Sequence, residues 1–253
     1  MKSERLKSAA RVSSLHLGLS VFVAVLSAVL VFLIWFPGEF REMVGGRELF
    51  LLVIAVDVVC GPLLTLVLFN PEKSRRELAL DMGMVGLMQM AALVYGVWTV
   101  WTVRPLYLVA EIDRFKVISA HQVDETSLKN LPDHLQRKLW NGPLTVGLRP
   151  LNKEERETVM FESVQGGRDY GERPEYFVTY DSAQALQNMK HAKSFENFLR
   201  KYPDQATPLN EIVGKSGTKL VDLRYLPIIA RQDWIAVLNP SGHVLGYLKG
   251  DGF

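Results

Sequence analysis

Three long apolar runs occupy the first part of the chain, at about residues 15–36, 49–69 and 82–103. A helix rises about 1.5 Å per residue, so each run is long enough to cross a hydrocarbon core of roughly 30 Å. The pattern therefore predicts three transmembrane helices. The first run is longer than the apolar part of a signal peptide, which favours a retained span over a cleaved leader.

Beyond residue 103 the pattern becomes that of a globular domain. Apolar and mixed positions alternate with period two over Pro105–Ser119, which predicts one strand leaving the third span. Cap signals predict four short helices, which start after Asn152, after Asp181, after Ser194 and at Thr207, the last one ending at Gly214. Strands are predicted again at 219–229, 234–238 and 243–248, the last two joined as an antiparallel hairpin.

These elements predict a membrane protein in which three N-terminal helices precede an α+β extracytoplasmic domain with a C-terminal antiparallel hairpin. We expect residues 1–103 to form the N-terminal tail and the helical bundle, and residues 104–253 to form the domain. The first strand is expected to pair with the last hairpin. Over all 253 residues the composition is 48% hydrophobic and 22% charged, an average that conceals these two parts.

Charge changes the picture in two ways. Basic residues are concentrated before the first run and in the loop between the second and third, which predicts that both segments are cytoplasmic and that the domain is outside. They are Lys2, Arg5, Lys7, Arg11, Lys73, Arg75 and Arg76. Acidic and basic residues are nearly balanced after Arg104, so nucleic acid is not an expected partner.

Asp57 lies inside the second apolar run, where a carboxylate costs roughly 2.5–3.5 kcal/mol on insertion scales. We therefore expect it to face the bundle. Counting residues from the outer end of each span places Ser27 and Tyr95 at the same depth. Asp57 is expected to be protonated or hydrogen-bonded to one of these hydroxyls, and either to lock the bundle or to receive a polar group from a partner helix.

Gly61 and Pro62 follow one turn after Asp57. Glycine permits close backbone approach, and proline removes a backbone donor from the helix. The pair predicts either a docking groove for another helix or close packing within the bundle. Both interpretations are open at this point.

No pattern of catalysis or cofactor binding stands out. The histidines lack a second ligand at metal spacing, and Gly214-Lys215-Ser216 lacks the earlier glycine of a phosphate-binding loop. The single cysteine, Cys60, lies within an apolar run. We therefore expect no catalytic, metal or cofactor site, no cofactor, and a protein that is not an enzyme.

Four pieces of sequence are distinctive: Phe32–Pro37, Asp57–Leu66 with Asn70-Pro71, Gln89–Gly96, and Arg104-Pro105 with Asp113–Phe115. Together they resemble the type IV pilin accessory proteins, the TfpX/TfpZ group. The resemblance implies a multi-pass protein of the bacterial inner membrane, with a cytoplasmic N-terminus and a periplasmic domain. It also implies an assembly factor with a chaperone-like role, which stabilises a cognate type IV pilin by contacting its transmembrane helix and head.

On this interpretation two sets of residues are expected to be functional. The helix groove or bundle lock is expected at Asp57, Gly61, Pro62, Tyr95 and Ser27. A junction between membrane and domain is expected at Arg104, Pro105, Tyr107, Asp113 and Arg114. The alternative is a membrane-anchored periplasmic sensor or signalling partner without its own output domain, and oligomers in the bilayer are left open.

Overall fold

The computed structural model describes residues 2–138 and 142–253; residues 1 and 139–141, which belong to the expected parts 1–103 and 104–253, lie outside the described residues. The chain forms two compact units. One comprises Met1–Gly38 and Gly46–Thr102, and the other comprises Glu39–Gly45 and Val103–Phe253. They are called here the bundle and the sheet domain.

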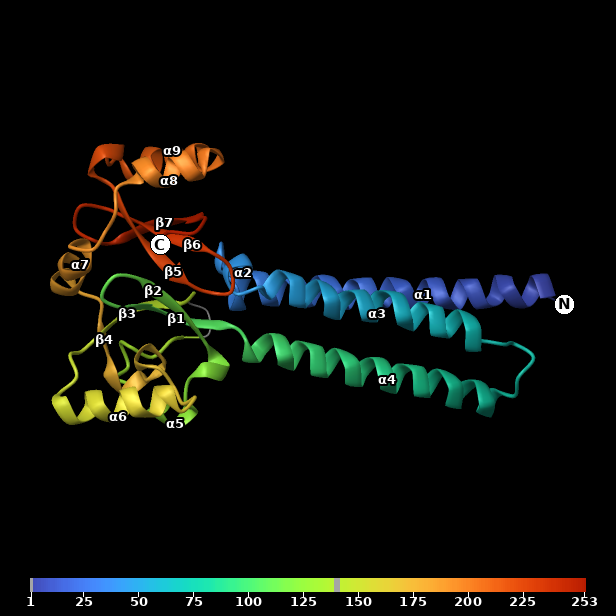
Figure 1. Cartoon of the computed structure of the whole chain (residues 1–253). Coiled ribbons are helices and arrows are strands. Elements are labelled where there is room, and N and C mark those ends of the chain that lie inside the picture. Colours follow the sequence, from blue (N-terminus) through green and yellow to red (C-terminus); the bar gives the residue numbers. More distant parts are fainter. Residues whose placement is uncertain (1, 139–141) are drawn as a thin grey trace. The chain divides into compact units, whose positions relative to one another are not determined.

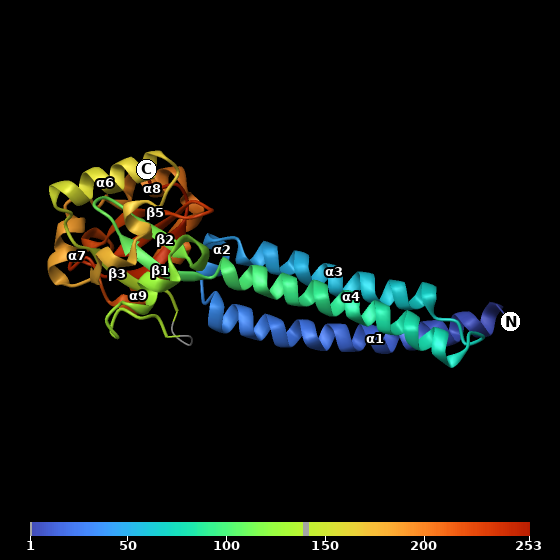
Figure 2. The same ribbon diagram turned by 90° about the horizontal axis from the view of Figure 1, so that it is seen from below.

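The bundle consists of the three expected long helices, which run lengthwise beside one another in both views (Figure 1, Figure 2). They are α1 (Lys2–Leu30), which continues as the π-helical turn η1 (Val31–Trp35), α3 (Gly46–Leu68) and α4 (Arg75–Thr102). Each is long and apolar enough to cross a membrane. The helix α3 packs against both α1 and α4, so it is the centre of the bundle.

The sheet domain is built on one seven-stranded sheet, which confirms the predicted α+β class. The strand order is β4-β3-β1-β2-β5-β6-β7, with β1–β3 and β2–β5 parallel and the other pairs antiparallel. The strands are β1 (Pro105–Ala110), β2 (Phe115–Ser119), β3 (Leu144–Leu148), β4 (Phe177–Thr179), β5 (Arg224–Ile229), β6 (Trp234–Leu238) and β7 (Val244–Lys249). The last three form the antiparallel end of the sheet.

The segment Pro105–Ser119 is a hairpin and not the single strand that the alternation predicted. The Glu111 N–H donates to the Arg114 carbonyl at 2.9 Å and closes a four-residue turn between β1 and β2. Alternation continues on both sides of the turn, which is why the pattern did not reveal it. Because β2 lies between β1 and β5, the expected pairing of the first strand with the last hairpin is wrong.

Six α-helices and five 3₁₀ turns are described in the sheet domain. The helices are α2 (Phe40–Met43), α5 (Glu125–Lys129), α6 (Lys153–Val164), α7 (Ser182–Met189), α8 (Phe195–Lys201) and α9 (Ala206–Ser216). The turns are η2 (Ala120–Gln122), η3 (Tyr170–Glu172), η4 (Pro174–Tyr176), η5 (Pro203–Gln205) and η6 (Leu220–Asp222), the last of which replaces the start of the strand expected from residue 219.

Local sequence signals set some of the helix ends, although Ser194 makes no side-chain cap before α8 and α9 begins at Ala206, one residue before the expected Thr207. The capping box between Asn152 and Glu155 and the Asp181 cap are confirmed, because their side-chain oxygens accept the free N–H groups of the first turns. The helix α9 ends at Ser216 and not at Gly214. Gly217 follows it with φ of 67°, the left-handed conformation that glycine adopts at low cost.

The short helix α2 lies in the loop between the first two spans but belongs to the sheet domain. Met43 is fully buried, and its carbonyl accepts a hydrogen bond from the Gln232 N–H at 3.1 Å. Phe40 packs edge-to-face on Tyr247, with ring centroids 5.3 Å apart. The pattern assigned this loop to residues 1–103, whereas its contacts place it in the core of the sheet domain.

Candidate functional site

The helix α3 turns a polar face toward the inside of the bundle. Asp57, Gly61 and Thr65 are spaced by four residues, so they lie one above the other on one side of the helix. Only 8% of Asp57 and 1% of Thr65 is exposed. We call the groups gathered here the polar seam: Ser13, His16, Ser20, Asp57, Gly61, Pro62, Thr65 and Gln89.

Two contacts of the polar seam join α3 to α1. His16 Nδ1 and Thr65 Oγ1 are hydrogen-bonded at 2.6 Å, and Ser13 Oγ donates to the Pro62 carbonyl at 2.7 Å. Between apolar helices in lipid such bonds supply part of the association energy, because burying leucine against leucine gains little there. These two hydrogen bonds join the C-terminal half of α3 to α1.

Gln89 of α4 joins all three helices. Its Nε2 donates to the Asp57 carbonyl at 2.9 Å and contacts Ser20 Oγ at 3.4 Å. The amide lies over Gly61, where an added Cβ would be 2.1 Å from Nε2. Glycine at position 61 is therefore required for this approach, and the Gly61–Pro62 face is used within the bundle.

Two acceptors in the polar seam have no partner among the described residues. They are Asp57 Oδ1 and Gln89 Oε1, and both are buried. A carboxylate and an amide oxygen cannot bond to each other, whereas a protonated carboxyl group is a donor. If Asp57 is neutral, its protonated carboxyl group is a donor at Oδ1 and can supply a hydrogen bond to an acceptor such as Gln89 Oε1.

The expected pairing of Asp57 with Tyr95 is wrong, because 68% of Tyr95 is exposed and its ring lies beside Trp98. Ser27 is half-buried and shares a face of α1 with Ser20, but Ser20 is the hydroxyl that meets Gln89. The prediction matched residues by their depth along each helix and did not consider which face of the helix each residue lies on. Positions 89 and 95 differ by about 240° around a helix with 3.6 residues per turn, and so lie on different faces.

The helical period of about 3.6 residues identifies which residues of α4 share its buried face. Val85, Gly96 and Val100 are the buried residues of α4, and Gln89 lies on the same face. An added Cβ on Gly96 would be 2.4 Å from Val53 Cγ1 of α3. A search for one face carrying glycine and a polar residue would have selected Gln89 rather than Tyr95.

The residues expected at the junction are not brought together by the structure. Pro105 begins β1, and the Arg104 carbonyl accepts the Ala120 N–H at 3.0 Å. Burial, followed by the nearby Arg137, lowers the pKa of the Arg104 guanidinium to about 10. Tyr107 is a core residue that is 1% exposed and donates its hydroxyl hydrogen to the Leu135 carbonyl at 3.0 Å.

Asp113 and Arg114 lie in the turn at the far end of β1 from Pro105. Arg114 Nε donates to Asp113 Oδ1 at 2.7 Å, and this hydrogen bond lowers the pKa of the Asp113 carboxyl. The guanidinium also lies 5.0 Å from the centre of the Phe253 ring. These contacts stabilise the turn and the C-terminus.

One face of α4 is hollowed and unoccupied by the other described helices. The hollow has a volume of about 540 Å³ and is lined by Leu87, Met90, Ala91, Val94, Tyr95 and Trp98. We call it the α4 hollow. Its lining is apolar except for the exposed Tyr95 side chain, so within a membrane it faces either lipid or another helix.

Comparison with known proteins gives a consistent set of relatives. Residues 4–45 match the family described as fimbrial assembly protein FimB. The chain is 30% identical to the fimbrial assembly protein of serogroup I from Dichelobacter nodosus over 257 residues, covering 100% of this chain and 99% of the relative. The serogroup E1 protein of that organism is 28% identical over the same proportions. The protein of serogroups C1 and C2 is 37% identical over 119 residues, which are 47% of this chain and 91% of the relative. No solved structure matches.

Proposed function

Because the chain belongs to the family of fimbrial assembly proteins, we propose that it is an accessory protein of the bacterial inner membrane that stabilises a type IV pilin or assists its assembly. The proposed action is chaperone-like and not enzymatic. It consists of holding a membrane-embedded subunit, which requires a docking surface but neither a cofactor nor bond chemistry.

The observation that carries the proposal is the α4 hollow. One face of α4 is buried at Val85, Gly96 and Val100, and the six exposed residues of the hollow form a concave surface elsewhere on the same helix. Exposed methionines are frequent on this helix, and methionine adapts to different partner surfaces. They are Met84, Met88 and Met90. We assign the hollow to the transmembrane helix of the pilin, with the Tyr95 hydroxyl as a polar contact in lipid.

In this proposal the polar seam has a supporting role. It holds α3 against α1 and α4 through the bonds of His16, Ser13 and Gln89, so that α4 keeps the shape of its outer face. Asp57 is then a neutral bundle lock and not a docking group. Its partner Gln89 lies on the buried face of α4, whereas the residues of the hollow are exposed, which supports this division.

The proposed orientation places the N-terminus and the loop after α3 in the cytoplasm and the sheet domain in the periplasm. The basic residues of those two segments support it. A reporter that is active only in the periplasm, fused after Phe253, should be active. The same reporter inserted in the loop at Glu72 should be inactive.

Deletion of the gene tests the function directly. We expect a lower steady-state level of the pilin and fewer surface pili, with both restored by the wild-type gene. An unchanged pilin level together with unchanged piliation would refute the proposal.

A photo-crosslinking residue tests the site. Placed at Val94 in the α4 hollow, it should crosslink the pilin in intact membranes. The matched control is Leu63 of α3, which is 54% exposed but lies outside the hollow. Equal pilin crosslinking from both positions would show that the hollow is not the docking site. The proposed function would then still be tested by the deletion experiment.

A further inference from the structure

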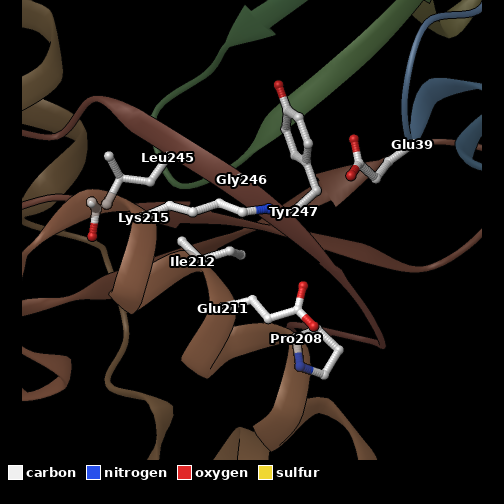
Figure 3. Close-up of a pocket in the computed structure, with 9 residues that line it drawn as sticks. Glu39, Pro208, Glu211, Ile212, Lys215, Leu245, Gly246 and Tyr247 are labelled. Atoms are coloured by element: carbon white, nitrogen blue, oxygen red, sulfur yellow. The ribbon is translucent and has the colours of Figure 1, made fainter.

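A cavity of about 360 Å³ lies in the sheet domain between helix α9 and strand β7 (Figure 3). Pro208, Glu211, Ile212 and Lys215 line it from α9, and Leu245, Gly246 and Tyr247 line it from β7. Glu39 contributes from the segment before α2. We call this cavity the β7 slot.

The strand β7 is an outer strand of the sheet, so one edge of its backbone is not paired with another strand. The pairing with β6 shows which groups face outward. The Gly250 N–H donates to the Asp233 carbonyl, which makes Trp234 and Lys249, and by alternation Ala236 and Tyr247, non-hydrogen-bonded pairs. The N–H and C=O of Tyr247 and Lys249 therefore point away from β6.

One of these outward N–H groups is already hydrogen-bonded to a side chain instead of to the carbonyl of a neighbouring strand. The Lys249 N–H donates to Gln205 Oε1 at 3.2 Å, an amide oxygen that occupies the place of a strand carbonyl. Within the described part of the chain, the outward N–H and C=O of Tyr247 have no such partner. The Tyr247 ring packs on Phe40 in the core, which leaves its main chain to the slot.

Charge in the slot favours a basic group. Glu39 and Glu211 are exposed carboxylates, and among the described residues neither forms an ion pair. Figure 3 shows the side chain of Lys215 extended across the slot, which Lys215 and Tyr247 both line. The slot therefore already accommodates an ammonium group, on a flexible side chain that can move into solvent.

We infer that the β7 slot binds an extended segment of a partner protein that carries a basic side chain. The segment adds as a strand to the free edge at Tyr247, and its lysine or arginine pairs with the Glu39 and Glu211 carboxylates while Lys215 moves into solvent. Addition of a strand to a sheet edge beside a helix is an established mode of peptide recognition, in which the main chain supplies affinity and side-chain pockets supply specificity. This surface belongs to the sheet domain alone and does not require the α4 hollow.

Binding of short peptides to the full-length protein in lipid nanodiscs tests the inference by fluorescence anisotropy. The probe is a fluorescein-labelled heptapeptide, Thr-Val-Thr-Lys-Thr-Val-Thr, with blocked ends. Two companions carry Glu or Leu at the central position. We expect the lysine peptide to bind most tightly and the glutamate peptide least tightly.

Variants of the protein separate charge from shape. The double substitution Glu39→Gln with Glu211→Gln should weaken the lysine peptide roughly tenfold, to the level of the leucine peptide. Lys215→Met should strengthen it severalfold, because the competing ammonium is removed. Glu196→Gln, on an exposed carboxylate of α8 outside the slot, is the control and should change nothing.

Methylated peptides test strand addition. Amides of alternate residues face one edge of an extended peptide, so methylation of one alternate set should abolish binding and methylation of the other set should not. Equal binding of both methylated peptides, or of the lysine and glutamate peptides, would overturn the inference. Absence of binding by every peptide would also overturn the inference, and crosslinking of a Glu211→Cys variant to a second copy would then identify that copy as the occupant.

Discussion

The bundle and the sheet domain differ in how much apolar surface they leave exposed and in where they bury polar groups. In the sheet domain Leu226, Ile235 and Leu238 are completely buried, as expected where water drives apolar groups together. In the bundle Leu15 is 79% exposed and Leu87 72% exposed, while Asp57 is inside. Lipid is as apolar as leucine, so apolar surface gains little from leaving it.

The difference shows where each unit is sensitive to substitution. The sheet domain depends on the volume of its apolar core, spread over many residues. The bundle depends on a few close approaches and hydrogen bonds, such as Gln89 over Gly61 and Val53 against Gly96. Substitutions that are mild in one unit are therefore expected to be severe in the other.

The largest effect is expected from Leu226→Ala in the sheet core. Truncating a fully buried leucine should lower the free energy of unfolding of the sheet domain by about 2–5 kcal/mol. Hydrogen exchange with mass spectrometry resolves both units, and protection should fall in β5 and β6 but not in α3. Val164→Ala, at a position 84% exposed, is the control. Loss of protection in both units to the same degree would break the comparison.

A smaller but still large effect is expected from Gly61→Ala in the bundle. The added methyl group meets the Gln89 amide, whose Nε2 would be 2.1 Å away, and overpacking of this kind costs about 1–3 kcal/mol. Unfolding of the bundle in mixed micelles measures it. The control is Gly18→Ala in α1, where nothing lies within 4 Å and alanine should be neutral or stabilising by up to about 1 kcal/mol. A lower free energy of unfolding for Gly61→Ala and an unchanged or higher one for Gly18→Ala would support the view that close approaches hold the bundle. Equal losses of stability in the two variants would contradict it.

Gln89→Leu should destabilise the bundle by about 0.6–2 kcal/mol. The substitution keeps the apolar bulk but removes the donor to the Asp57 carbonyl and to Ser20. Met88→Leu changes an adjacent, 60% exposed side chain and serves as the control in the same micelle assay. If both variants unfold like the wild type, the hydrogen bonds of Gln89 do not stabilise the bundle.

The smallest effect concerns pH and the start of α6 on the surface of the sheet domain. Hydrogen bonds from Arg149, followed by the hydrogen bond from the Asn152 N–H, lower the pKa of Glu155 to about 2, whereas the pKa of an unfolded glutamate is about 4.3. The stabilisation is complete above that unfolded value and is lost as pH falls through about 2.

Glu155→Gln should therefore remove a small acid-induced loss of protection in α6 that the wild type shows between these two pH values. Hydrogen exchange corrected for intrinsic rates measures it, with Glu157→Gln on the same helix as the control. A wild-type protein with no such acid dependence would contradict the assignment.

Sequence patterns were sufficient for many local features, although they missed the turn at Glu111–Arg114 because the alternation continues on both sides of it. The three spans follow from length and hydropathy, and the starts of α6 and α7 follow from Asn152 and Asp181, whose side chains cap the next turn. They were insufficient where the cause was distant in the chain. The pairing of β2 with β5 and the burial of Met43 under the sheet involve segments that no short pattern connects.

The functional residues divide in the same way. The sequence alone determined that Asp57 must lie inside a helical bundle, because a carboxylate in hydrocarbon is costly whatever surrounds it. Only the tertiary structure decided that Gln89 donates to the Asp57 carbonyl and to Ser20. It also decided that Gly61 leaves room for this amide of α4 and that the Tyr95 side chain is exposed. Hydropathy depends on what a side chain is, whereas contact depends on how neighbouring helices are rotated and shifted, and packing alone sets those two quantities.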